Sequence, residues 1–164
     1  MVDITIRKMI KEDIDPCVKM TITSFPWTTF GLKYKSAEKF FLDRLESDNK
    51  EVYVAIFNQE VVGFIAIKKD ILFANYIRRI VVREDIRSKG IGAMLMKFIE
   101  ELTLESGLPN VFLITTTVNK KAVEFYEKNG YKIIGTLPDF IKLGIDEYIF
   151  WKTKGPVDSF NVYD

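Results

Sequence analysis

The run from Arg87 to Ala93 has the residue types and spacing of a seat for a phosphate group. It reads Arg-Ser-Lys-Gly-Ile-Gly-Ala, follows the apolar stretch 80–82 and leads into an amphipathic segment, 91–102, with helical periodicity. Glycine has no side chain to hold a ligand away, and the first N–H groups of a helix have no intrahelical partner. The helix dipole favours an anion at the same end, where Arg87 and Lys89 add positive charge. The sequence therefore predicts a strand, a tight turn and a helix that together bind a pyrophosphate.

Two better-known glycine loops do not fit this run. A Walker A loop ends in Gly-Lys-Ser or Gly-Lys-Thr, and this run does not. A dinucleotide fingerprint needs a third glycine, and Leu95 stands in its position. A G-x-G at a strand–helix junction is equally typical of a plain tight turn, so the neighbouring elements have to decide between the two interpretations.

The composition narrows the chemistry that the chain can perform. Its 164 residues suit one domain, and the absence of histidine excludes a Ser-His-Asp triad, a Cys-His dyad and histidine-based metal sites. The one cysteine, Cys17, has no partner for an internal disulfide, and its apolar neighbours predict a buried core residue rather than a nucleophile. We expect no metal and a cytoplasmic location.

Charge and hydropathy argue against nucleic acid and membrane as partners. Lys and Arg number 24 and Asp and Glu 23, so the chain has no overall field that would attract a polyanion. Charged side chains occur throughout residues 1–25, and no apolar run approaches the length of a membrane span. Any electrostatic recognition must therefore be local.

Hydrophobic periodicity and turn signals predict an α/β fold with the order β-α-α-β-β-β-α-β-α-β-β. The alternating segments 51–57 and 61–68, joined by Asn58-Gln59-Glu60, are typical of a hairpin. An antiparallel meander combined with one crossover helix indicates a mixed, mostly antiparallel sheet flanked by helices. The predicted strands are 4–10, 51–57, 61–68, 74–83, 111–117, 131–137 and 145–153, and the predicted helices are 14–22, 36–45, 91–106 and 120–128.

Two segments in this order resemble the GNAT superfamily of acetyl-CoA-dependent N-acetyltransferases. The stretch from Ile80 to Gly92 is similar to the family's fourth strand and its Arg/Gln-x-x-Gly-x-Gly/Ala loop. The stretch from Asn119 to Tyr131 is similar to its Asn-x-x-Ala-x-x-Phe-Tyr-x-x-x-Gly-Phe segment. The resemblance covers about residues 3–154, and it implies a GNAT-like sheet in a domain over 1–154 with 155–164 as a tail.

The resemblance implies acetyl-CoA as cosubstrate and an amine as acceptor, with direct attack of the amine in a ternary complex. Backbone groups of Ile80, Val81 and Val82 then pair with pantetheine as with an added strand. The pyrophosphate is held by the amides of Arg87, Ser88, Lys89, Gly90, Ile91, Gly92 and Ala93. Asn119 is either a further coenzyme contact or the N-cap of its helix.

Tyr126 is the candidate general acid for the leaving thiolate. A phenol titrates near 10 and stays protonated at neutral pH, so it has a proton to donate. From the residues alone, one of Phe125 and Tyr126 packs in the core and the other faces the sheet. The family's Phe-Tyr order selects Tyr126.

The chain departs from the family where several members keep a glutamate as general base. That position, six residues before Val82, is Tyr76. Proton removal then runs through Tyr76, through water or through an acid on another element, for which the candidates are Asp70, Asp139, Asp146 and Glu147. An α-amine, with a pKa near 8, needs less help from a base than a lysine amine near 10.4, which favours an α-amine or a water relay.

Recognition of the acceptor is expected on the loops 25–35 and 137–147. The candidate residues are Phe25, Trp27, Phe30, Tyr34, Tyr76 and Asp139, although loop aromatics often simply pack and loop acids often face solvent. We predict a peptide or protein amine rather than a small metabolite. Two alternatives stay open: an acetyltransferase of small amines, and a sensor or scaffold domain that binds acyl-CoA without catalysis. The tail 155–164 is a candidate cover for an apolar surface or for a second copy in a homodimer.

Overall fold

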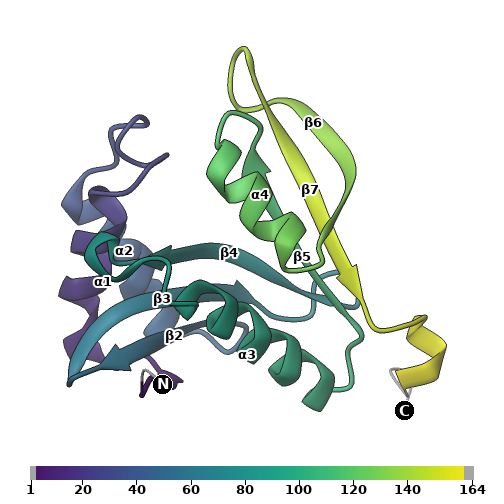
Figure 1. Cartoon of the computed structure of the whole chain (residues 1–164), viewed down its shortest axis with the longest axis horizontal. Helices are drawn as coiled ribbons and strands as arrows, with labels where there is room; N and C mark the ends of the chain where they lie inside the picture. Colours follow the sequence, from purple (N-terminus) through teal and green to yellow (C-terminus); the bar gives the residue numbers. More distant parts are fainter. Residues whose placement is uncertain (1–2, 161–164) are drawn as a thin grey trace. The chain divides into compact units, whose positions relative to one another are not determined.

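The computed structural model describes residues 3–160, and its elements follow the order predicted from the sequence (Figure 1). The strands are β1 Thr5–Lys8, β2 Lys50–Phe57, β3 Glu60–Lys68, β4 Ala74–Val82, β5 Asn110–Thr116, β6 Lys132–Lys142 and β7 Ile145–Thr153. The helices are α1 Ile14–Ile22, α2 Tyr34–Leu45, α3 Ile91–Glu105 and α4 Lys120–Lys128, with short 3-10 helices η1 Lys11–Asp13, η2 Glu84–Ile86 and η3 Val157–Phe160. No helix formed by the described residues is long and apolar enough to cross a membrane.

The strand pairing confirms the predicted α/β class with a mixed, mostly antiparallel sheet. The strand order is β1-β2-β3-β4-β5-β7-β6, and β4 pairs with β5 in parallel. A parallel pair needs a long crossover connection, which α3 supplies. The chain divides into two compact units, one of Met1–Lys69 with Arg79–Phe98 and one of Asp70–Arg78 with Ile99–Asp164. Both β4 and α3 therefore contribute residues to each unit.

The β2–β3 hairpin of the first unit follows from its turn residues. Asn58 and Gln59 have φ values of 49° and 65°, as the central pair of a type I′ turn requires. Successive side chains of β2 then alternate between the two faces of the sheet. Val54 points toward α1 and α2, whereas the ring of Tyr53 lies 4.9 Å from that of Phe98 on α3.

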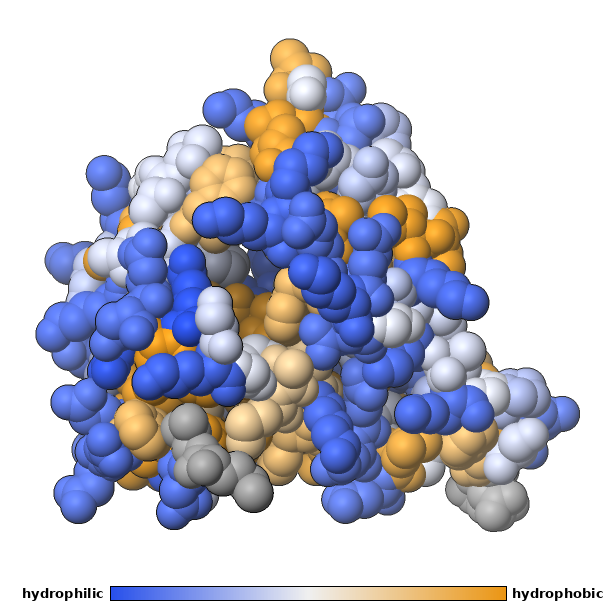
Figure 2. All heavy atoms as spheres, viewed as in Figure 1, coloured by the Kyte–Doolittle hydropathy of each residue, from blue (hydrophilic) through white to orange (hydrophobic). Residues whose placement is uncertain are grey.

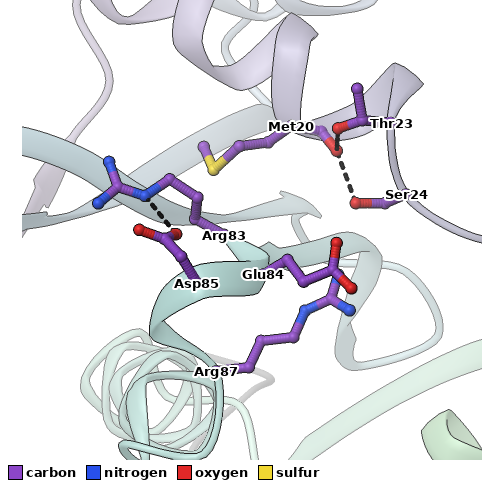
Figure 3. Close-up of a pocket in the computed structure, with 7 residues that line it drawn as sticks. All are labelled: Met20, Thr23, Ser24, Arg83, Glu84, Asp85 and Arg87. Carbon is purple, nitrogen blue, oxygen red and sulfur yellow. Dashed lines mark hydrogen bonds and ion pairs between the residues drawn. The ribbon is translucent and has the colours of Figure 1, made fainter.

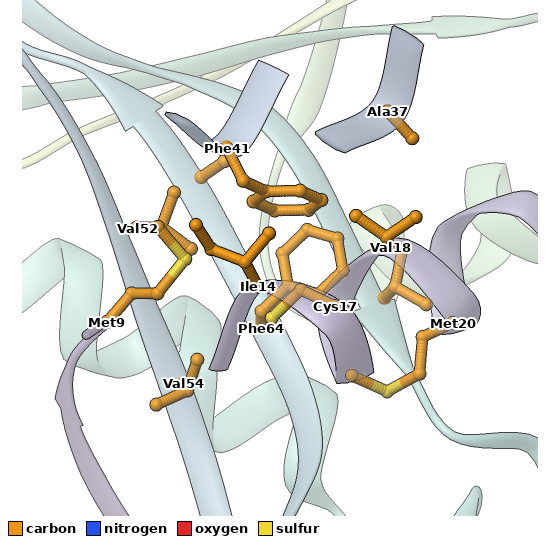
Figure 4. Close-up of a cluster of buried hydrophobic side chains, with 12 residues drawn as sticks. Met9, Ile14, Cys17, Val18, Met20, Ala37, Phe41, Val52, Val54 and Phe64 are labelled. Atoms are coloured by element: carbon orange, nitrogen blue, oxygen red, sulfur yellow. The ribbon is translucent and has the colours of Figure 1, made fainter. Parts of the chain in front are cut away.

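Figure 4 shows the core of the first unit, where α1 and α2 pack on one face of β2 and β3. Phe41 is fully buried, and its ring meets that of Phe64 edge to face at 5.1 Å. Cys17 is fully buried in the same cluster, and burial raises the pKa of its thiol, so it fills space and stays protonated. The cluster comprises Met9, Ile14, Cys17, Val18, Met20, Ala37, Phe41, Val52, Val54, Phe64, Ala66 and Val81.

The second unit is built from β5, β6, β7, α4, the first half of β4 and the end of α3. Residues Ala74–Ile77 of β4 pair with Asn110–Leu113 of β5. On β7, Lys152 places its Nζ 2.8 Å from the carboxylate of Glu100 on α3, and the Tyr131 hydroxyl donates to the same carboxylate at 3.1 Å. These bonds tie α3 to the sheet within this unit.

The segment 137–147, which we expected to be a loop, is instead the end of the β6–β7 hairpin. Strand β6 continues to Lys142, and β7 begins at Ile145. The pairing with β7 is irregular between Leu137 and Lys142, and within this stretch Asp139 takes a φ of 50° and its carboxylate accepts the N–H of Gly144. This bond joins β6 to the turn residue that precedes β7, and no local residue pattern reveals it.

Apolar side chains gather over the end of this hairpin (Figure 2). Phe140 is 53% exposed, Ile141 55% and Leu143 87%. Clustered apolar side chains in contact with water are typical of surfaces that bind another molecule. The hairpin end is therefore a surface to consider for acceptor recognition.

Replacement of Phe41 by alanine should destabilise the fold strongly, because it empties a fully buried position between Phe40 and Phe64. We expect the free energy of unfolding to fall by about 3–5 kcal/mol. The control is Leu42→Ala on the same helix, where the side chain is 42% exposed and the change should stay within about 1 kcal/mol. Urea unfolding followed by circular dichroism measures both, and equal effects would contradict this account of the core.

Candidate functional site

The loop between β4 and α3 has the backbone geometry of an anion seat. Ser88 and Gly90 take positive φ values of 68° and 78°, and a Cβ placed on Gly90 would meet nothing within 4 Å. The first helical bond runs from Met94 N–H to Gly90 O at 3.0 Å, so the N–H groups of residues 91–93 lie ahead of the helical ladder. Open space, unpaired amides and the positive helix end coincide there.

The backbone of β4 leading into this loop is polarised between its two edges. The N–H of Arg83 donates to the carbonyl of Val62 on β3 at 2.8 Å. In an antiparallel pair, alternate residues point both backbone groups at the same neighbour. Val81 therefore points toward β3, while Ile80 and Val82 point away from it. Of the three residues predicted to pair with pantetheine, these two have backbone groups in the required direction.

Arg87 uses its side chain within the loop itself. Its Nε donates to the carbonyl of Val82 at 3.0 Å. The guanidinium thereby links the end of β4 to the loop that begins α3, and the Val82 carbonyl already has a partner. Arg87 positions the strand end as well as adding charge near the phosphate seat.

A hollow of about 250 Å³ lies beside this loop in the first unit (Figure 3). One wall is the end of α1, with Met20, Thr23 and Ser24, and the other is the stretch from Arg83 to Arg87. Arg83 is bound to Glu60 at 2.8 Å and to Asp85 at 2.7 Å, so its charge is largely neutralised. No sequence motif marks the α1 residues, because only the packing of that helix brings them to the loop.

In the second unit, Asn119 is the N-cap of α4. Its side-chain oxygen accepts the N–H of Ala122 at 3.2 Å. This confirms one of the two interpretations offered for the residue, since the bond satisfies a free donor of the first helical turn. A contact between Asn119 and a coenzyme stays a prediction.

Tyr126 faces inward from α4 and is 8% exposed. Its ring packs 5.4 Å from that of Phe150 and edge to face with Phe125 and Tyr131. Burial raises the pKa of the Tyr126 phenol above its ordinary value, with a smaller contribution from Tyr76. No hydrogen bond to its hydroxyl is seen within residues 3–160. The phenol is thus protonated and has a proton free to donate.

The ring of Tyr76 lies on one face of the sheet, and Phe150, which the ring of Tyr126 contacts, lies on the other. Its ring stacks on Phe112 at 4.9 Å, and Phe112 in turn stacks on Trp151 at 6.1 Å. The pKa of Tyr76 is raised chiefly by burial and also by Glu147, while the nearby Arg78 opposes this. A phenol that keeps its proton cannot accept another one, so Tyr76 is a poor general base. The acid beside it is Glu147.

Glu147 and Thr116 are buried polar residues that face each other across β5 and β7. They are register partners, 4% and 3% exposed. Glu147 Oε1 and Thr116 Oγ1 find no hydrogen-bond partner among the residues that the structure describes. Burial raises the pKa of Glu147, and the neighbouring threonine offsets this only in part. The sequence marked Glu147 as one of four acids, whereas nothing in it singled out Thr116.

The other residues predicted to recognise the acceptor differ in their surroundings. Phe25 and Phe30 are exposed, and Trp27 packs against the core of the first unit. Tyr34 belongs to α2, which begins two residues earlier than we expected, and its hydroxyl donates to Asp15 at 2.7 Å. Asp139 is held in the hairpin end by its bond to Gly144. Phe25, Phe30 and Tyr34 therefore have rings that are partly exposed, although the Tyr34 hydroxyl is already bound to Asp15.

Known proteins resemble the chain over most of its length. The profile of the Acetyltransferase (GNAT) family matches residues 17–131. An N-alpha-acetyltransferase of Saccharolobus solfataricus is 24% identical over 159 residues, covering 90% of this chain and 91% of that protein. A spermidine N(1)-acetyltransferase of Thermoplasma acidophilum is 27% identical over 150 residues, covering 81% of this chain and 91% of that protein.

Solved structures share the fold. Ard1 from Thermoplasma volcanium superposes with a TM-score of 0.78 at 28% identity, covering 93% of this chain and 98% of that one. An aminoglycoside 6'-N-acetyltransferase complexed with coenzyme A gives a TM-score of 0.77 at 19% identity, covering 93% and 98%. With a family profile that spans more than half of its residues, the chain belongs to the GNAT acetyltransferase family, whose members transfer an acetyl group from acetyl-CoA to an amine.

Proposed function

We propose that this chain acetylates the amine of a peptide or protein, by direct attack of the amine on the thioester of acetyl-CoA in a ternary complex. The observation that carries the coenzyme assignment is the β4–α3 loop, where the amides of residues 91–93 precede the helical ladder beside an open glycine. A pyrophosphate supplies the acceptor oxygens that those amides need. Ile80 then offers its backbone N–H and carbonyl to the pantetheine amides, and Val82 offers its N–H, since its carbonyl is bound by Arg87.

Tyr126 is the proposed general acid. When the amine nitrogen has bonded to the thioester carbon, the C–S bond breaks and the thiolate takes the phenol proton. The proton left on the new amide nitrogen restores the phenol, so this exchange releases no proton, and the one proton released overall is the one that the acceptor ammonium loses before it attacks. Support comes from the unpartnered hydroxyl in its buried aromatic setting. A domain that only bound acyl-CoA would have no need of this group.

The acceptor class is supported by two features. The apolar end of the β6–β7 hairpin, with Phe140, Ile141 and Leu143 exposed, suits the side chains of a peptide better than a small polar amine. The similarity to a protein named N-alpha-acetyltransferase spans nearly the whole chain. The second candidate acceptor is a polyamine, since a relative named spermidine N(1)-acetyltransferase is equally similar and Glu147 is suited to a cation.

The acceptor class can be decided by supplying acetyl-CoA together with a library of peptides that have free N-termini, and separately with spermidine. We expect thiol release and a mass increase of one acetyl group on peptides. Mass spectrometry distinguishes α-amine from lysine products. Efficient acetylation of spermidine with no peptide modified would favour the second candidate, and coenzyme binding without turnover of any acceptor would favour a sensor.

Gly90→Val should weaken CoA binding, because the side chain would enter the open space at the loop and strain a φ of 78°. We expect a loss of at least about tenfold in affinity, equal to about 1.4 kcal/mol. Gly144→Val is the matched control, since Gly144 has a φ of 82° and equally open surroundings in the hairpin end. Calorimetry on folded protein measures both, and equal affinities would remove the pyrophosphate assignment.

Tyr126→Phe should lower kcat by about 10²–10⁴-fold while CoA affinity stays nearly unchanged, because only the donated proton is lost and the ring still packs. Tyr131→Phe is the control, since that hydroxyl donates to Glu100 rather than to a ligand. Single-turnover kinetics make chemistry the measured step. Wild-type turnover by Tyr126→Phe would mean that another group protonates the thiolate.

A further inference from the structure

We propose that Glu147 binds the ammonium group of the acceptor and takes its proton before the amine attacks the thioester. This inference rests on the acetyltransferase function proposed above and adds to it a residue that the family motifs do not contain. Glu147 lies at the start of β7, in the second unit. It meets the need left by Tyr76, which stands where several family members have a glutamate.

The Glu147 carboxylate is buried with one of its oxygens left without a hydrogen bond. The residue is 4% exposed, its Oε1 has no hydrogen-bond partner of good geometry among residues 3–160, and the Thr116 hydroxyl beside it only partly offsets the effect of burial on its pKa. A buried carboxylate oxygen without a partner loses its hydration and gains little in return. Buried polar groups without a partner are rare in natural proteins, and a catalytic role is one of the recognised reasons for keeping one. An ammonium group has three N–H donors and a compensating charge.

The surroundings of Glu147 define the chemistry of this ligand. Thr116 lies directly opposite on β5, where its hydroxyl is near enough to lower the pKa of the Glu147 carboxyl, and Leu137 lies opposite on β6. The alternation of β5 and β7 places the Tyr76, Phe112 and Trp151 stack on the same face. A carboxylate and a hydroxyl at the end of an aromatic stripe suit a primary amine carried on an apolar group.

The charges facing Glu147 leave its carboxylate available for this role. Tyr76 on β4 is close enough for the two groups to interact, and Arg78, on the same face of β4, is exposed and acts on Tyr76. No lysine or arginine forms an ion pair with Glu147 in the described part of the chain. The neighbouring acid Asp146 differs, because its carboxylate already accepts the N–H of Asp139 at 3.2 Å.

The proton passes from the acceptor ammonium to the carboxylate of Glu147. An N–H bond of the ammonium breaks, an O–H bond forms on the Glu147 carboxylate, and the electron pair stays on nitrogen as the nucleophile. Burial supports the step, because it raises the pKa of Glu147 toward that of an amine and so reduces the cost of the transfer. The carboxylate is lost as the pH falls through this raised pKa, so the reaction should slow on the acidic side.

Glu147→Gln tests the assignment, because it keeps the shape of the side chain and removes its charge. The control is Glu127→Gln on α4, an exposed residue whose replacement changes the net charge equally. Glu147→Asp keeps the carboxylate and should retain part of the activity. The probes are the peptides with free α-amines and, separately, spermidine, each with saturating acetyl-CoA, and thiol release is followed from pH 5 to 10.

We expect kcat/KM for the acceptor to fall about 10²–10⁴-fold at neutral pH in Glu147→Gln, with the KM for acetyl-CoA and the Glu127→Gln variant unchanged. The pH profile should also change shape. In the wild type, kcat/KM should fall above the pKa of the acceptor amine, about 8 for an α-amine, because the ammonium form binds. In Glu147→Gln, it should rise through that pKa, since only the neutral amine reacts.

Thermal unfolding separates this role from a structural one. The variant Glu147→Gln should melt at or above the wild-type temperature, because it removes an unpaired buried charge. A lower melting temperature with the wild-type pH profile retained would make Glu147 structural and overturn the inference. Wild-type kcat/KM in Glu147→Gln would also overturn it while leaving the proposed function intact. No turnover of either probe by the wild-type protein would instead overturn the proposed function, and the inference with it.

Discussion

The division of β4's backbone hydrogen bonds is the constraint on which the proposed site depends. Residues Ala74–Ile77 pair with β5, and Arg83 donates to Val62 of β3 at the other end of the strand. Between these ends, the direction of the backbone groups alternates from residue to residue, so the N–H and carbonyl groups of Ile80 and Val82 point away from β3. The same strand then runs through η2 into a loop where Gly90 takes a φ of 78°. One continuous stretch of backbone thus supplies both a strand edge and a helix N-terminus, which an extended ligand with a phosphate at one end requires.

Local patterns predicted those parts of the fold that depend on neighbours in sequence. Helix α4 has the predicted bounds, Asn119 caps it, and the hairpin turn falls at Asn58-Gln59, because capping and turn geometry involve residues only a few positions apart. The bond from Arg87 to the Val82 carbonyl and the α1 wall of the hollow had no such signal. The facing of Thr116 and Glu147 depends on the β5–β7 register, which is set by packing across the sheet. Sequence therefore located the coenzyme motif better than the acid that we place beside the acceptor.

Buried polar side chains such as Asn75 and Glu51 are hydrogen-bonded in this chain, unlike Oε1 of Glu147. Asn75 donates to Thr103 at 2.9 Å, and Thr103 donates in turn to a carbonyl of its own helix at 2.6 Å. Glu51, 8% exposed, accepts bonds from Lys8, Lys69 and Tyr53. Both are the satisfied arrangements expected of residues that serve the fold. Glu147 is equally buried, yet its Oε1 has no such bond within the described residues, although the same sheet provides three for Glu51.

Burial raises the pKa of several ionisable groups of this chain, and three of them show how different the chemical results can be. It raises the pKa of Cys17, Tyr126 and Glu147 alike, because a desolvated site disfavours the charged form of each. For Cys17, inside an apolar cluster, the result is an inert thiol. For Tyr126, it keeps in place a proton that a leaving thiolate can take. For Glu147, it increases the affinity for a proton in a group that begins as a carboxylate. A single physical effect thus favours an acid on α4 and a base on β7, and the chemistry of each residue type decides which of the two it becomes.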